Sequence, residues 1–184
     1  MPTLYLLIGG NQDDRLQTIT QAADLIRQRI GSVVACSHIY ETAPWGTFAD
    51  GEKPLDFYNQ ALEVSTTLSP HEALKEALDI EHQLGRRRKE IGNSMPHLDN
   101  TQCTMLNSKL YSSRPIDIDL IFYGDAVIDT PKLTIPHPRM HLRRFVLQPM
   151  CEIAPCYKHP ILNKTLTELL NECTDTSSCL CCSL

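Results

Sequence analysis

Hydrophobic and polar positions along the chain follow two periods, which predicts short strands alternating with amphipathic helices. Residues 57–66 alternate between apolar and polar, as a strand with one buried face does. A helix start is marked by Ser69 as cap, by Pro70 in the first turn and by Glu72 at the capping-box position. The predicted strands are 4–8, 32–41, 57–66 and 117–123, and residues 126–134 are predicted to add a short strand or a hairpin. The predicted helices are 14–30, 69–84, 144–153 and 165–170.

The order of these elements, β-α-β-β-α-β, predicts an α+β fold of the ferredoxin-like kind, in which helices pack on one face of an antiparallel sheet. Residues 87–113 show little periodicity, and a long loop of this kind inside a compact domain is usually functional or disordered. We expect one domain at residues 1–172, with a C-terminal extension that ends in a flexible, cysteine-rich tail at 173–184.

Composition narrows the possible partners. The chain has 184 residues and a formal net charge of −5, which argues against binding nucleic acid because that function requires a basic surface. No stretch approaches the roughly 18 apolar residues of a membrane-spanning helix, and the first residues lack the basic leader of a signal peptide. We expect a cytoplasmic protein with small-molecule partners, no nucleic acid and no membrane, and we expect a monomer.

The chain has eight cysteines, and four of them, Cys173, Cys179, Cys181 and Cys182, lie in the last dozen residues. Cysteines of a cytoplasmic protein are expected to be thiols. Cys179 and Cys182 have the spacing of one half of a zinc site, but no second pair follows at a zinc-ribbon distance. A thiol-rich tail is therefore favoured over structural zinc.

Two aspartates open the predicted strand at 117–123. Side chains at alternate positions of a strand leave from one face, so Asp117 and Asp119 should converge while Ile116 and Ile118 face the core. Neighbouring carboxylates repel each other unless a positive charge lies between them, and Mg²⁺ commonly bridges such oxygens to phosphates. A solvated strand face with two surface aspartates is the alternative interpretation.

Basic residues are concentrated around this strand and the segments that would flank it. They are Arg86, Arg87, Arg88, Lys89, Arg114, Lys132, Arg139, Arg143 and Arg144. A cationic pocket beside two carboxylates suits a polyphosphate with Mg²⁺, although each arginine alone would more often be a solvated surface charge. His137 lies between two prolines and is either a structural hydrogen-bonding residue or a phosphate contact.

Several segments occur in an order typical of one family. They are Leu6-Leu7-Ile8-Gly9-Gly10-Asn11, Ser37 to Gly46 with Tyr40-Glu41-Thr42 and Pro44, Asp56-Phe57-Tyr58-Asn59, Ile80-Glu81 with Gly85-Arg86, Arg114-Pro115-Ile116-Asp117-Ile118-Asp119, and Pro136-His137-Pro138-Arg139-Met140 with Arg143 and Phe145. Over residues 1–157 the chain resembles the 6-hydroxymethyl-7,8-dihydropterin pyrophosphokinases of folate biosynthesis. Gly10 stands where that family usually has serine, the span from Arg86 to Arg114 is longer than usual, and the tail has no counterpart.

The resemblance implies transfer of a pyrophosphoryl group from ATP to the hydroxymethyl group of the pterin, giving the pterin diphosphate and AMP. It implies that Asp117 and Asp119 bind two Mg²⁺ ions and act in catalysis with Arg86, Arg88 and Arg114. The implied ATP contacts are Glu81, Arg86, Arg88, Arg114, Lys132, His137 and Arg143. The implied pterin contacts are Thr42, Pro44, Trp45, Phe57, Asn59 and Phe145, with the two phenylalanines on either side of the ring.

Two other classes of protein fit parts of the pattern. One is a ferredoxin-like nucleotide-binding regulatory module. An RNA-recognition domain would be one example, but such a domain would require a basic sheet face and an aromatic-rich strand. The other is a Mg²⁺-dependent phosphohydrolase that uses the same two aspartates. Release of AMP that depends on a pterin would distinguish the kinase from both.

Overall fold

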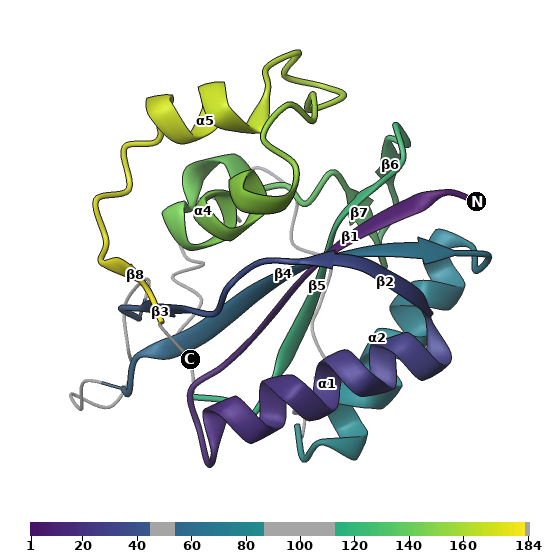
Figure 1. Cartoon of the computed structure of the whole chain (residues 1–184). Coiled ribbons are helices and arrows are strands. Elements are labelled where there is room, and N and C mark those ends of the chain that lie inside the picture. The colour runs from purple at the N-terminus through teal and green to yellow at the C-terminus, as the bar shows by residue number, and fades with distance from the viewer. Residues whose placement is uncertain (45–53, 87–112, 183–184) are drawn as a thin grey trace, which may run out of the picture.

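The computed structural model describes residues 1–44, 54–86 and 113–182. The strands are β1 (Thr3–Gly10), β2 (Gly31–Cys36), β3 (Tyr40–Thr42), β4 (Phe57–Thr66), β5 (Asp117–Tyr123), β6 (Ile128–Asp129), β7 (Thr134–Ile135) and β8 (Cys179–Cys181). The helices are α1 (Arg15–Arg29), α2 (Pro70–Gln83), α4 (Arg144–Ile153) and α5 (Leu166–Glu172), with a 3-10 helix η1 (Met140–Leu142). Figure 1 shows their arrangement.

The main sheet is antiparallel, with strand order β5-β1-β4-β3-β8, and β2 also pairs with β4. The α+β class is thereby confirmed. The strand expected at 32–41 is two strands, because Ser37 interrupts it: its hydroxyl oxygen accepts a hydrogen bond from the Ala61 backbone N–H at 3.0 Å. β2 therefore pairs with the second half of β4 and β3 with the first half. The expected hairpin is present as β6 and β7.

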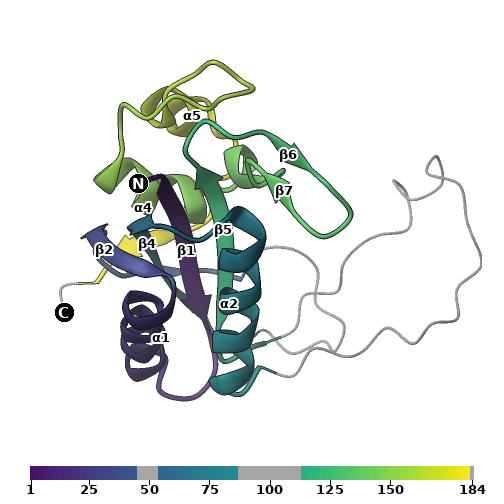
Figure 2. The ribbon, with the colours of Figure 1, turned by 90° about the vertical axis from the view of Figure 1, so that its right-hand side faces the viewer.

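Helices cover both faces of this sheet, whereas the sequence pattern predicted one face. α1 and α2 pack on one side over Leu6 and Ile8, and α4 and α5 pack on the other side over Leu7 (Figures 1 and 2). The reason lies in β1, where every residue from Leu4 onward is buried. A strand buried on both faces requires a layer on each side.

Local capping fixes where the helices begin. Ser69 and Glu72 form the predicted capping box of α2, and the side chain of Asp14 accepts from the Gln17 backbone N–H at 3.0 Å at the start of α1. These caps satisfy backbone donors that a helix leaves unpaired in its first turn. None of the helices in the described part of the chain is long and apolar enough to cross a membrane.

The C-terminal segment forms an edge strand where we expected a flexible tail. Cys179–Cys181 pair with β3 as β8, and the Cys182 backbone N–H donates to the Ile39 carbonyl at 2.8 Å. The cysteines in the described residues are free thiols. The division of the chain at residue 172 remains a prediction.

Candidate active site

Three central strands bring an amide and a carboxylate to one face of the sheet. Gly9 of β1 lies opposite Asn59 of β4 on one side and opposite Asp117 of β5 on the other. Since neighbouring strands are about 4.8 Å apart, Asn59 and Asp117 flank a gap of roughly 10 Å. Gly9 has no side chain, and the Asn59 amide lies in the space above it: a Cβ atom at Gly9 would lie 2.2 Å from the Asn59 Oδ1.

Asp117 lies between two guanidinium groups. Its Oδ2 accepts from Arg114 Nη1 at 2.5 Å, and its Oδ1 is paired with Arg86 Nη1. Burial tends to raise the pKa of Asp117, but Arg114 and Arg86 outweigh it and hold the pKa below its ordinary value. Asp117 is therefore a carboxylate at neutral pH, and the Arg114 Nε is buried without a hydrogen-bond partner among the described residues.

Asp119 lies on the same face as Asp117, and Ile118 faces the core between them, as predicted. Burial first, and then the charge of Asp117, raise the pKa of Asp119 to about 7, against the opposing effect of Arg143 and Arg114. The pair therefore favours either a proton or a cation between its oxygens.

These donors suit one kind of metal. No group of three or more His, Cys, Asp or Glu side chains that could hold a metal ion exists within residues 1–44, 54–86 and 113–182. A zinc site of the usual type would need such a group. Mg²⁺ is commonly bound through one or two carboxylates together with substrate phosphates. The oxygens of Asp117 and Asp119 thus fit Mg²⁺ that arrives with a nucleotide.

Glu81, at the end of α2, organises the cationic side of the site. Its side chain is 1% exposed, and its Oε1 accepts from the Ile118 backbone N–H at 2.8 Å and from Arg86 Nη1 at 2.6 Å. It thereby ties α2 to β5 and turns Arg86 toward Asp117. Its predicted contact with the nucleotide remains a prediction.

Asn11 is a positioning residue that the sequence analysis did not single out. Its Oδ1 accepts from the Arg114 backbone N–H at 2.8 Å, and its own backbone N–H donates to the Arg114 carbonyl at 3.1 Å. Its Nδ2 donates to the carbonyl of Leu55 and to the hydroxyl of Ser113. The only sequence signal was the Gly9-Gly10-Asn11 turn that ends β1.

His137 and Arg143 lie close enough to the carboxylates to affect them electrostatically. Burial, then Arg143 and Arg139, lower the pKa of His137 to about 4. Its Nδ1 accepts from the Arg139 backbone N–H at 3.4 Å, so a neutral ring carries its hydrogen on Nε2 and can donate there. Lys132 lies exposed in the turn between β6 and β7.

The amide end of the gap is formed by the residues expected to contact the pterin. Asn59 is 5% exposed, and its Nδ2 donates to the Thr42 hydroxyl at 2.7 Å. Phe57 lies two residues before Asn59 in β4, and the Arg114 guanidinium is 5.9 Å from its ring centre. Phe145 belongs to the helical layer formed by α4 and α5 and lies in the first turn of α4.

The remaining residues that were predicted to contact substrate lie at or beyond the limits of the described segments. Pro44 follows β3 and is half-buried, and it is the last residue described before the gap at 45–53. Trp45, Arg88 and the rest of the segment 87–112 lie outside the described residues. For every residue named here, the role in binding or catalysis remains a prediction.

The fold and this face together define a class: an α+β protein that joins a carboxylate pair among guanidinium groups, a set of side chains suited to phosphate groups and a metal ion, to a buried amide. A sequence profile of the 7,8-dihydro-6-hydroxymethylpterin-pyrophosphokinase (HPPK) family matches residues 5–155. The chain belongs to this family.

Two full-length relatives carry the name 2-amino-4-hydroxy-6-hydroxymethyldihydropteridine pyrophosphokinase. The protein of Porphyromonas gingivalis is 32% identical over 161 residues, which cover 87% of this chain and 95% of that protein. The protein of Aquifex aeolicus is 32% identical over 184 residues, which cover 100% of this chain and 99% of that protein.

Solved structures agree on the fold. Plasmodium falciparum HPPK-DHPS with SDX-DHP superposes with a TM-score of 0.64 at 16% identity, over 94% of this chain and 43% of that chain. The same wild-type protein with pteroate gives 0.66 at 18% identity, over 93% and 42%. This chain therefore spans less than half of those proteins.

Proposed function

We propose that this protein transfers a pyrophosphoryl group from ATP to the hydroxymethyl group of 6-hydroxymethyl-7,8-dihydropterin, giving the pterin diphosphate and AMP, in folate biosynthesis. Membership of the family supports the activity. The observation that carries it in the structure is the arrangement on either side of Gly9: Asp117 lies between two arginines on one neighbouring strand, and Asn59 lies on the other. The chemistry of the two ends suits a substrate with a phosphate group at one end and a flat polar group at the other.

At the phosphate end, Asp117 and Asp119 would bind Mg²⁺, and we propose two ions. The metal would neutralise charge on the ATP phosphates, and Arg86 and Arg114 would bind phosphate oxygens through their guanidinium groups. We propose that His137, Arg143, Lys132 and Arg88 bind the same polyphosphate. Transfer of this kind depends mainly on positioning and charge stabilisation, so no strong general base is needed.

At the pterin end, Asn59 would pair with the polar edge of the ring. The Thr42 hydroxyl holds the Asn59 amide in one orientation. A ring with the wrong edge would leave a buried amide unpaired, which gives sharp discrimination. We propose that Phe57 and Phe145 cover the two faces of the ring, and that Pro44 and Trp45 complete the pocket.

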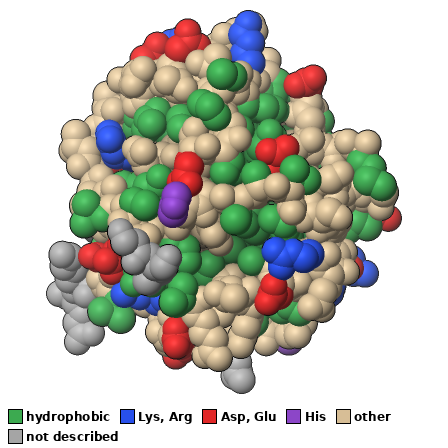
Figure 3. Space-filling view, in the orientation of Figure 1, with side chains coloured by type: hydrophobic (Ala, Val, Ile, Leu, Met, Phe, Trp, Pro, Cys, Tyr) green, Lys and Arg blue, Asp and Glu red, His purple; other side chains and the backbone are tan. Residues whose placement is uncertain are grey.

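We also propose the finer features that the sequence suggested. The strand order β5-β1-β4 followed by β2 and β3 supports a ferredoxin-like core. A monomer, a cytoplasmic location, and a single catalytic domain at residues 1–172 complete the proposal. On the face drawn in Figure 3, acidic and basic side chains are interspersed among apolar ones, which favours small-molecule partners over nucleic acid.

Purified protein with ATP, Mg²⁺ and 6-hydroxymethyl-7,8-dihydropterin should produce AMP and the pterin diphosphate. The Asp117→Asn and Asp119→Asn variants should lose activity on the order of a thousandfold, because each loses metal charge stabilisation in the transition state. Asp129→Asn is the matched control, since Asp129 is exposed in the β6–β7 hairpin. Chromatographic separation of nucleotides measures the result.

Other outcomes would point to the other classes. Release of inorganic phosphate without pterin would indicate the phosphohydrolase. Binding of ATP by folded protein with no turnover in the presence of pterin would indicate the regulatory module.

A further inference from the structure

The C-terminal segment contacts both layers that carry the predicted pterin contacts. It runs from α5 past the start of α4 to β3 (Figure 1). Alternate residues along it are half-buried, namely Cys173, Asp175, Ser177 and Cys179, and the residues between them are exposed. This period of two is that of an extended chain lying against a surface.

Its first attachment is to β3. Thr42 pairs with Cys179, and Tyr40 pairs with Cys181. The Ala43 backbone N–H donates to the Ser178 carbonyl at 3.3 Å. β3 has only three residues, and with β8 in place it is paired along both edges. β3, which holds Thr42 against Asn59, is therefore held on its outer edge by β8.

Its second attachment is to the start of α4. The helix begins at Arg144, and the side chain of its N-cap residue, Arg143, makes no capping hydrogen bond. Instead the Arg144 backbone N–H donates to Asp175 Oδ2 at 2.9 Å. The carboxylate is itself held by the Ser177 backbone N–H at 3.0 Å. An acceptor and a negative charge at a helix N-terminus stabilise its first turn, which here contains Phe145.

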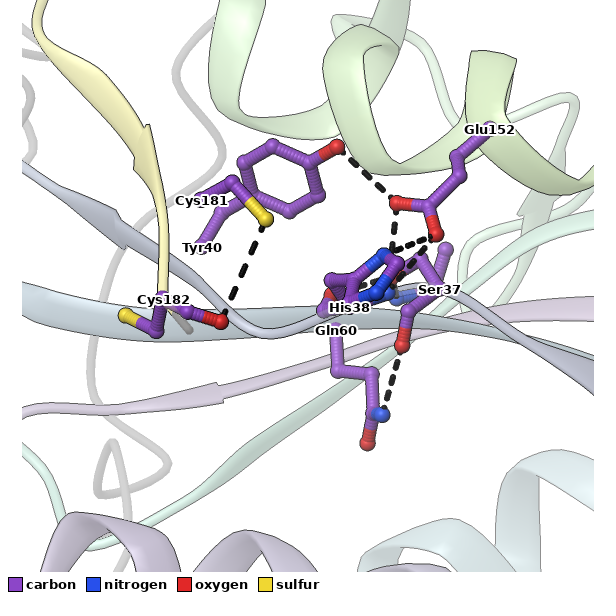
Figure 4. A network of polar contacts seen from close by, with 8 residues as sticks. Ser37, His38, Tyr40, Gln60, Glu152, Cys181 and Cys182 are labelled. Carbon is purple, nitrogen blue, oxygen red and sulfur yellow. Dashed lines mark hydrogen bonds and ion pairs between the residues drawn. The ribbon is translucent and has the colours of Figure 1, made fainter. Parts of the chain in front are cut away.

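The opposite end of α4 has an attachment of its own. Glu152 accepts hydrogen bonds from the His38 backbone N–H and from the Tyr40 hydroxyl, as Figure 4 shows beside Cys181 and Cys182. The helix is therefore anchored at its end by Glu152, while its beginning depends on Asp175.

We propose that residues 175–182 brace the pterin end of the active site. Asp175 and β8 are positioning elements: they fix the first turn of α4, with Phe145, relative to β3, with Thr42, and so set the affinity for the heterocycle. The proposal rests on the proposed function, because it concerns the same site. It assigns no contact between the brace and the substrate.

Leu180 allows a matched test on the full-length chain. Its side chain is 63% exposed, so Leu180→Ala should leave β8 in place. Leu180→Pro removes a backbone N–H from the middle of the strand and should undock it. We expect Leu180→Pro to raise KM for the pterin about fivefold or more, with kcat and KM for ATP within about twofold of the Leu180→Ala values.

Asp175 gives an independent pair of variants. Asp175→Ala should raise KM for the pterin by a similar factor, and Asp175→Asn, which retains a capping oxygen, should restore it. Equal pterin KM values for Leu180→Pro and Leu180→Ala would overturn the proposal. If the wild-type protein makes no AMP, the proposed function fails, and the second measurement below still tests the brace.

Alkylation of Cys179 reports docking without activity. Burial raises the pKa of its thiol to about 11, so iodoacetamide should modify Cys179 slowly in the wild type, as resolved by peptide mass spectrometry. Leu180→Pro and Asp175→Ala should accelerate the modification at least about fivefold relative to Leu180→Ala and Asp175→Asn. Equal rates in all four variants would show that the segment does not brace the fold.

Discussion

At the residue scale, the absence of a side chain at Gly9 matters as much as the charged groups around it. Gly9 lies between Asn59 and Asp117 in the sheet register. A Cβ atom there would lie 2.2 Å from the Asn59 Oδ1, and 3.1 Å from the carbonyl oxygen of Tyr58. The amide of Asn59 would have to turn away from Thr42 to make room.

We therefore expect Gly9→Ala to fold and to bind the pterin poorly. The displaced atom is the end of a side chain, so the loss of stability should be only about 1 kcal/mol. A displaced or unpaired buried amide costs about 1–3 kcal/mol, which corresponds to a rise of roughly 10- to 100-fold in KM for the pterin. Steady-state kinetics with each substrate varied in turn measures the effect. A larger effect on KM for ATP than on KM for the pterin would contradict it.

Sequence reasoning succeeded where chemistry followed from local spacing. The shared face of Asp117 and Asp119 needed only the period of a strand, and the structure confirms it. The partners that fix these groups could not be predicted, because they are distant in sequence. Asn11 holds Arg114 across 103 residues, and Glu152 reaches His38 across 114.

At the element scale, contacts between residues distant in sequence also explain the two wrong predictions: the single strand at 32–41, and helices on only one face of the sheet. The alternation at 32–41 did not indicate that the Ser37 hydroxyl, in place of a backbone carbonyl of the neighbouring strand, would accept the hydrogen bond from the Ala61 backbone N–H. The apolar run in β1 predicted only a strand, and nothing local identified α4 and α5 as a second layer over it. Those helices are placed by their packing on Leu7, which only the folded topology brings beneath them.

Glu152 provides the element-scale prediction. Its carboxylate accepts from the His38 backbone N–H at 3.0 Å and from the Tyr40 hydroxyl at 2.9 Å, which anchors α4 over the β2–β3 connection. Burial tends to raise the pKa of Glu152, but the hydrogen bonds from His38 and Tyr40 lower it below its ordinary value of 4.5. Because the pKa is lowered in the folded state, the ionised carboxylate stabilises the fold at pH values above the ordinary pKa of the group. This stabilisation is lost as the pH falls through the lowered pKa.

Glu152→Gln should therefore lower the free energy of unfolding at pH 7 by on the order of 1 kcal/mol. The difference in the free energy of unfolding between the variant and the wild type should shrink as the pH falls below 4.5 and through the lowered pKa of Glu152. Urea unfolding at several pH values measures it. Glu172→Gln is the control, because Glu172 is 57% exposed and pairs only with Lys164 among the contacts described. A difference that stays constant with pH would exclude this role for the Glu152 carboxylate.

At the scale of the whole molecule, β1 connects the two cores and the site. Leu6 packs with α1 and α2 on one face, Leu7 packs with α4 and α5 on the other, and Gly9, one residue before the end of the strand, lies in the candidate active site. The two helical layers therefore share a central strand. Neither layer can lose its packing without exposing one face of that strand.

This sharing predicts that the two cores unfold together. Ile26 and Leu147 are fully buried, one in each core. We expect Ile26→Ala and Leu147→Ala each to lower the free energy of unfolding by about 2–5 kcal/mol. Both variants should keep a single transition and an unchanged denaturant slope, as in a two-state domain. Urea unfolding followed by both fluorescence and circular dichroism measures this.

The control is Val127→Ala, since Val127 is 59% exposed and its truncation should change stability by less than about 0.5 kcal/mol. If Leu147→Ala produced two transitions, or a lower slope than Ile26→Ala, the layer formed by α4 and α5 would be a separate folding unit. The candidate active site would then lie between two units, because Asn59 and Asp117 belong to the sheet and Phe145 belongs to α4. A single transition in both variants would mean that the surfaces expected to face the pterin become ordered in one step.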